Sequence, residues 1–202
     1  MIAEITPPPL EVRYVHVWIW ARTAAYLAGL VIGTTAIGTL AGEIGTIAPV
    51  NIGMDAGSIW VEWIAVTSVA YGLHEFEIVR LPVPQHYWQV PSDWARFGKI
   101  GQQFMYGLVL GVEVLTLIPY ATFYILMLFE LALGLKGGAL VGLIYGLARA
   151  IPTIAGVAAS VRFANNTPVM MIILRARSMF HRANGVMLIT VGIVLLGGRW
   201  FG

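Results

Sequence analysis

The stretch that decides the fold is Tyr106–Leu135, which reads YGLVLGVEVLTLIPYATFYILMLFELALGL. It is apolar over more than the roughly 20 helical residues that cross a bilayer. Pro119 interrupts it, and because proline removes a backbone donor and clashes with the preceding turn, a helix must kink or open there. In lipid, opened backbone persists only beside protein or a water-filled cavity, and broken helices often carry the working site of transporters. The break is therefore either a simple kink or a functional site at Pro119, Tyr120 and Thr122.

The composition of the whole chain indicates an integral membrane protein. Of its 202 residues, 58% are hydrophobic and 11% are charged, whereas soluble domains carry about 25% charged residues. There is no cysteine, which excludes disulfides, thiol catalysis and cysteine-ligated metal centres. No basic patch interleaved with aromatic residues indicates nucleic-acid binding. The first residues, MIAEITPPPLEV, lack the basic head and apolar core of a signal peptide, so we expect the first span to remain in the mature protein.

The apolar pattern predicts an all-α, polytopic membrane bundle of about five transmembrane helices, one of them broken by proline. Residues 1–22 are expected to form an extended, proline-containing arm and an aromatic interfacial lead-in, and residues 23–202 a single membrane domain. Lys136-Gly137-Gly138 is expected to connect two spans, and Val169–Arg182 to lie on the membrane surface as an amphipathic helix. The expected spans are Thr23–Ala41, Ser58–Val79, the broken segment 102–135, Ala139–Ala159 and Gly185–Leu196.

Small residues in the first expected span indicate close helix packing. Gly29 and Gly33 lie four apart, a spacing that lets helix backbones approach closely. Packing inside the protein is the favoured interpretation, and a dimer face is the alternative.

The distribution of cationic residues predicts the orientation. If the broken segment crosses once, only Lys136 and Arg199 fall on the second side of the membrane, and cationic loops stay cytoplasmic. We therefore expect an inner (plasma) membrane protein with its N-terminus in the cytoplasm and its C-terminus outside. The cations on the first side are Arg13, Arg22, Arg80, Arg96, Lys99, Arg162, Arg175, Arg177 and Arg182.

Two charged residues fall near the middle of expected spans, and intramembrane ionisable groups indicate function by default. Glu113 and Arg149 have similar predicted depths, at about 1.5 Å of rise per residue, so we expect them to pair. Alternatively, one or both face a wet crevice or a neighbouring subunit. Glu130 lies nearer the outer surface and is expected to reach water or Lys136.

No other constellation in the sequence points to chemistry. His74 and Glu77 share a helix face, but two ligands do not make a metal site, so a solvated or hydrogen-bonded helix end is favoured. No serine has a nearby partner for nucleophilic catalysis, and no glycine loop binds phosphate. We therefore expect no catalytic residue, no metal and no cofactor.

Several segments resemble the membrane domain of the CcdA/DsbD family, which carries reducing equivalents for cytochrome c maturation. The resemblance implies that family's fold, but not thiol–disulfide transport, which requires a thiolate. Pro119-Tyr120-Ala121-Thr122 stands where the family has a cysteine-containing Pro-Cys-x-x-Pro element. The segments that resemble the family are YGLHEFEIVRLPVP (71–84), YGLVLGVEVLTLIPYATFYIL (106–126), GALVGLIYGLARAIPTIAG (138–156) and HRANGVMLITVGIVLLGG (181–198).

The resulting hypothesis is a non-enzymatic, cysteine-less relative of CcdA-type carriers, acting as a carrier or assembly component of a membrane redox system. A structural subunit of a respiratory or photosynthetic complex and a small-solute transporter are the alternatives. The expected partners are the lipid bilayer and other membrane subunits or further copies of the chain, and not nucleic acid.

Overall fold

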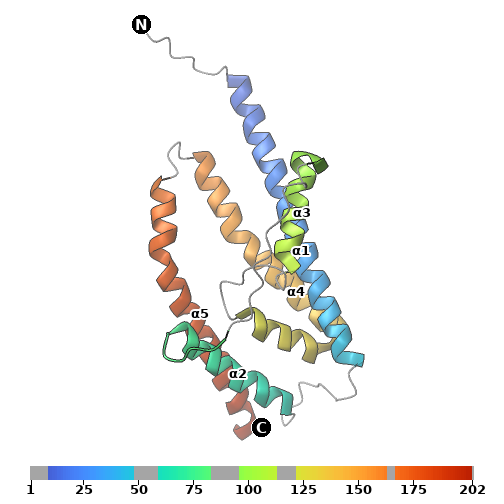
Figure 1. Ribbon diagram of the computed structural model, residues 1–202, viewed down its shortest axis with the longest axis vertical. Coiled ribbons are helices and arrows are strands. Elements are labelled where there is room, and N and C mark those ends of the chain that lie inside the picture. Colours follow the sequence, from blue (N-terminus) through green and yellow to red (C-terminus); the bar gives the residue numbers. More distant parts are fainter. Residues whose placement is uncertain (1–8, 48–58, 83–95, 113–121, 163–166, 202) are drawn as a thin grey trace.

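The computed structural model describes residues 9–47, 59–82, 96–112, 122–162 and 167–201, and these ranges contain five α-helices and no strand. Figure 1 shows that α1 begins at one end of the elongated molecule and that α5 ends at the other. The prediction of an all-helical protein is confirmed for these ranges. The helices are α1 Pro9–Ile47, α2 Ile59–Glu75, α3 Gly98–Val112, α4 Thr122–Arg162 and α5 Thr167–Phe201.

Helix α1 is longer than the first expected span at both ends. It begins at Pro9, so the extended arm was wrong for residues 9–13, and the lead-in of residues 14–22 belongs to the same helix. Proline is favoured in the first helical turn, where its missing N–H needs no intrahelical partner. At the other end, residues 42–47 continue the helix although a loop was expected there.

One expected connection and the expected surface helix are both parts of longer helices. Lys136-Gly137-Gly138 lies inside α4, and the chain bends earlier, at Gly134, whose φ of 70° and ψ of −176° are not helical. This bend turns α4 sharply (Figure 1). Helix α5 joins the expected surface helix and the last expected span into one element of 35 residues.

Glycines bring the helices close together in two groups. Helix α1 packs against α3 and α4, whereas α2 packs mainly against α5. A Cβ built on Gly33 would lie 2.5 Å from the carbonyl oxygen of Leu108 on α3, and a Cβ on Gly29 would clash with the carbonyl of Phe104. The favoured interpretation of Gly29 and Gly33, packing inside the protein, is therefore confirmed.

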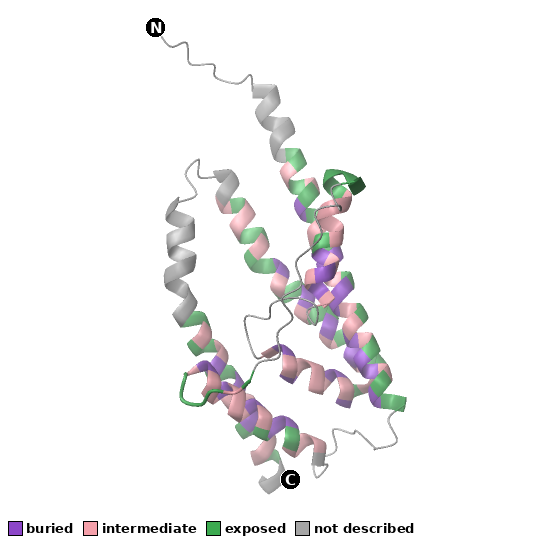
Figure 2. Cartoon of the chain, viewed as in Figure 1, coloured by how far each residue is buried: buried purple, intermediate pink, exposed green. Residues whose placement is uncertain are grey.

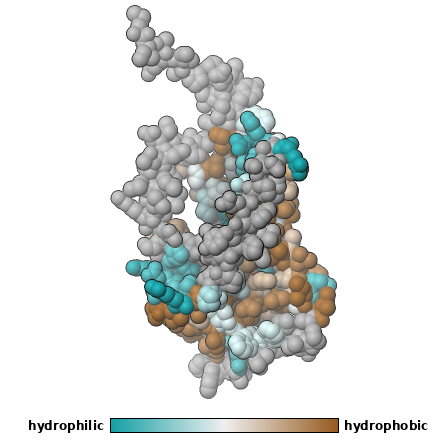
Figure 3. All heavy atoms as spheres, viewed as in Figure 1, coloured by the Kyte–Doolittle hydropathy of each residue, from teal (hydrophilic) through white to brown (hydrophobic). Residues whose placement is uncertain are grey.

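Three helices in the described part of the chain are long and apolar enough to cross a membrane, at Val17–Ile47, Thr122–Ala159 and Met179–Gly198. Helices α2 and α3 are shorter, at 17 and 15 residues, so the five-span bundle stays a prediction. Buried residues concentrate where helices meet (Figure 2), and apolar residues cover much of the visible surface of the lower half (Figure 3). This exposed apolar surface is compatible with a membrane location.

Candidate functional site

A series of hydrogen-bonded polar side chains connects α2, α4 and α5. The Nδ1 atom of His181 lies 2.6 Å from Oε2 of Glu75, and Asn184 donates from Nδ2 to Oε1 of Glu75 at 2.8 Å. The hydroxyl of Thr122 in turn donates to Oδ1 of Asn184. We call these four residues the Glu75 cluster.

The cluster forms because α2 and α5 approach each other closely beside it. A Cβ built on Gly185 would lie 2.8 Å from the ring of Phe76 and 3.1 Å from the carbonyl oxygen of Gly72. This proximity allows two short side chains of α5 to reach the carboxylate at the end of α2. His181 and Asn184 lie three residues apart and therefore share the helix face that meets Glu75.

Burial makes the cluster energetically important. The Glu75 side chain is only 3% exposed, whereas that of His181 is 31% exposed. A buried carboxylate is costly unless it is paired and hydrogen-bonded, and here each of its oxygens has a partner. The geometry supports two roles: a polar clamp between three helices, and a carboxylate–imidazole pair whose imidazole reaches the surface.

The sequence did not predict this cluster. Glu75 stands between His74 and Glu77, and His181 falls in Val169–Arg182, the segment that was expected to lie on the membrane surface. Two features of the sequence could have indicated it: a carboxylate at the end of one apolar helix, and a His-x-x-Asn spacing in another. No short-range pattern shows that these two helices meet.

The end of α2 explains the neighbouring His74 and Glu77. Glu77 adopts a positive φ of 61°, its N–H donates to the carbonyl of His74, and the N–H of Ile78 donates to the carbonyl of Leu73. These bonds form a Schellman cap. The N–H of Leu81 also donates to Nδ1 of His74 at 3.1 Å. The hydrogen-bonded helix end is confirmed, and the described residues contain no group of three or more ligands for a metal.

Arg149 lies in α4 and makes a specific contact with α3. Its Nη1 donates to the carbonyl oxygen of Leu110 at 3.1 Å, and its guanidinium lies over the ring of Tyr145, 5.7 Å from the centroid. The predicted partner, Glu113, lies outside the described residues, and so do Pro119 and Tyr120. Leu110 is three residues before Glu113, so the charge pair remains a prediction that the position of Arg149 permits.

Of the predicted helix-break site, only Thr122 is described, and it belongs to the Glu75 cluster. Glu130 differs from its expected position. It is 4% exposed, and its Oε2 has no hydrogen-bond partner within the described residues, so the expected contact with water or Lys136 was wrong. The reason is packing, since an Oε1 of Glu130 lies 2.9 Å from a Cβ built on Gly38 of α1.

Comparison with known proteins gives one consistent similarity. The chain is 34% identical to the methylamine utilization protein MauF of Paracoccus versutus over 61% of its own length and 44% of that protein. It is 33% identical to MauF of Paracoccus denitrificans, over 63% of its own length and 45% of that protein. It is 28% identical to MauF of Methylobacillus flagellatus, over 94% of its own length and 65% of that protein.

These relatives correct the resemblance to the CcdA/DsbD family. The curated proteins that the chain matches are named MauF, so the resemblance was wrong. Its glycine and proline patterns occur wherever membrane helices pack closely, so they do not identify a family. No family model matches the chain, and no solved structure matches it. The chain spans less than two thirds of the length of the MauF proteins that it matches, and it is similar to them over most of its own length.

Proposed function

We propose that this chain is an integral membrane component of methylamine utilization with an accessory, non-enzymatic role. The observation that carries the proposal is its similarity to MauF proteins, which reaches across 94% of the chain in the relative from Methylobacillus flagellatus. The three long apolar helices support the membrane location.

The accessory role is supported by how the polar groups are used. In the Glu75 cluster, both carboxylate oxygens face side chains of α5, which suits a clamp that fixes the arrangement of helices. The proposed partners are the lipid bilayer and other membrane proteins or a second copy of this chain. Exposed apolar residues on α1, α4 and α5 provide the surface for such contacts, among them Ile44, Leu147 and Val194.

The proposed orientation places the N-terminus in the cytoplasm and the C-terminus outside, in the plasma membrane. The uneven distribution of cationic residues supports it. In intact cells, an impermeant thiol reagent should label a cysteine at Gly53 or Gly197 and leave a cysteine at Gln85 unlabelled. Labelling at Gln85 from outside would contradict this orientation.

Gene deletion tests the proposed pathway. A deletion strain should lose growth on methylamine as the only nitrogen source and should grow normally on ammonium. A plasmid copy of the wild-type gene should restore growth, and the tagged protein should sediment with membranes. If the deletion strain grows on methylamine like its parent, the proposed role is wrong.

A further inference from the structure

The molecule contains a pocket, lined by both apolar and polar side chains, where α1 and α4 move apart. Close to the bend, the two helices touch through glycines: a Cβ on Gly42 would lie 2.6 Å from the carbonyl carbon of Gly134, and a Cβ on Gly146 would lie 3.1 Å from the Cα of Val31. Further along α4, Gly156 has no atom within 4 Å of a Cβ built on it. Pro152 lies between these glycines and removes one helical hydrogen bond, which favours a bend.

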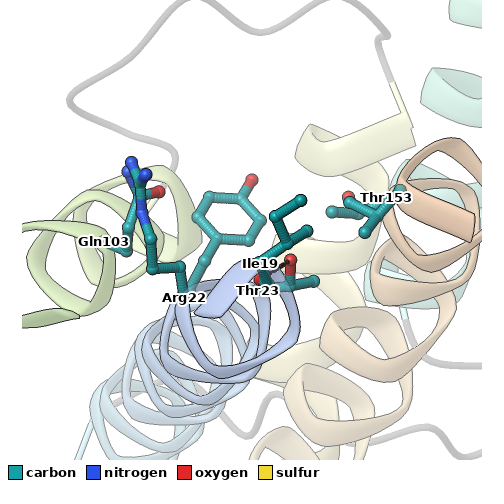
Figure 4. A pocket seen from close by; sticks show the side chains of 7 residues that line it. Ile19, Arg22, Thr23, Gln103 and Thr153 are labelled. Carbon is teal, nitrogen blue, oxygen red and sulfur yellow. Dashed lines mark hydrogen bonds between the residues drawn. The ribbon is translucent and has the colours of Figure 1, made fainter. Parts of the chain in front are cut away.

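The pocket fills this divergence and is bounded by α1, α3 and α4. Its volume is about 330 Å³. Figure 4 shows Arg22 and Gln103 beside each other on one side and Thr153 on the opposite side, with Ile19 and Thr23 between them. The lining residues are Ile19, Arg22, Thr23, Tyr26, Gln103, Thr153 and Val157.

The lining has the chemistry of an oxyanion site. Its polar side chains are those of Arg22, Thr23, Tyr26, Gln103 and Thr153, and none of the described residues that line it carries a carboxylate. The hydroxyl of Thr23 already donates to the carbonyl of Ile19 at 2.9 Å. Guanidinium groups bind phosphate through paired, charge-assisted hydrogen bonds, so a phosphate group matches the donors here.

The position of the pocket agrees with the headgroup layer of a membrane. Its α1 residues lie within nine residues of Val17, where one apolar span begins, and Val157 lies two residues from Ala159, where another ends. Trp18 is 52% exposed beside it on α1, and tryptophan is enriched at membrane interfaces. On α4, the exposed side chains of Ile151 and Ile154 offer apolar surface for an acyl chain.

We propose that this pocket binds the phosphate group of an anionic phospholipid. Arg22 binds the phosphate, Gln103 and Thr153 donate to its oxygens or to the headgroup hydroxyls, and the acyl chains lie along α4. This step rests on the orientation proposed above, in which this side of the membrane faces the cytoplasm, where anionic lipids attract basic sites. The inference is independent of any role in methylamine utilization.

Lipid binding to the full-length protein in neutral detergent tests the proposal. Phosphatidylglycerol should raise the unfolding temperature more than phosphatidylcholine does, and native mass spectrometry should detect it bound. Arg22→Gln should weaken phosphatidylglycerol binding about tenfold, the effect of losing one charge-assisted hydrogen bond. Thr153→Val removes a hydroxyl at nearly constant shape and should weaken binding by a smaller factor. It serves as the second variant if Arg22→Gln fails to fold.

The matched control is Arg80→Gln, which removes an exposed charge outside the pocket and should leave lipid binding unchanged. Equal losses in the Arg22 and Arg80 variants would overturn the proposal, because they would indicate non-specific attraction. Equal stabilisation by the two lipids would also overturn it. Stabilisation by inorganic phosphate alone, without an effect of phosphatidylglycerol, would overturn the lipid assignment and identify the ligand as a soluble oxyanion.

Discussion

Replacing Gly134 by alanine should destabilise the protein by breaking the bend in α4. Gly134 has φ 70° and ψ −176°, a region of backbone conformation that is essentially limited to glycine. A side chain held there costs about 1–3 kcal/mol. The new methyl group would also lie 3.1 Å from Cγ2 of Thr46, but this is the end of a side chain and can move. The backbone term should therefore dominate.

For a chain of this size, that cost lowers the unfolding temperature by roughly 2–12 °C. The assay is thermal unfolding of the purified protein in detergent. Gly156→Ala is the matched control in the same helix, because a Cβ there meets nothing within 4 Å, and it should leave stability unchanged or raise it by up to about 1 kcal/mol. Adding Thr46→Ser to Gly134→Ala should not restore stability. Full stability of Gly134→Ala, or its rescue by Thr46→Ser, would refute the reasoning.

Two double-mutant cycles and one proline substitution test the predicted and observed sites. Glu75→Gln and His181→Gln should each lower the free energy of unfolding by about 1–3 kcal/mol. The double variant should lose less than the sum of the two, with a coupling energy of about 0.5–3 kcal/mol. Additive losses would contradict direct contact between the two side chains. Glu113→Gln and Arg149→Gln should be non-additive in the same assay if the predicted charge pair exists, and strictly additive losses would show that the two charges do not meet. If the break at Pro119 is functional, Pro119→Ala should impair growth on methylamine while the protein level stays normal. Mild effects on both growth and protein level would support a simple kink.

Local composition was sufficient to predict that the chain is helical. A helix forms its hydrogen bonds within four residues, so apolar runs and the absence of breakers predict it without knowledge of its neighbours. The apolar character of α4 and the close-packing role of Gly29 and Gly33 were both predicted in this way. The ends of elements were predicted less well, because Pro9 is compatible with a helix start as well as with an extended arm.

The bend of α4 shows why the sequence did not predict it. Proline changes the backbone chemistry wherever it stands, so the sequence predicts a kink or break at Pro119, which lies outside the described residues. Glycine permits a left-handed conformation without requiring one, and this chain has 23 glycines. Contacts of Gly134 with α1 explain why the bend occurs at this glycine and not at another. These contacts exist only after α1 and α4 have packed.

The Glu75 cluster and the pocket depend on contacts between distant parts of the chain. His181 lies 106 residues after Glu75, and Gln103 joins Arg22 and Thr153 only because α3 and α4 both pack against α1. No short-range sequence pattern predicts these contacts. The donors that offset the cost of burying a carboxylate come from other helices, and they reach it only when those helices pack together. Sequence composition therefore predicted a helical membrane protein, whereas the packing of α2 against α5 and of α1 against α4 determined which polar groups meet inside it.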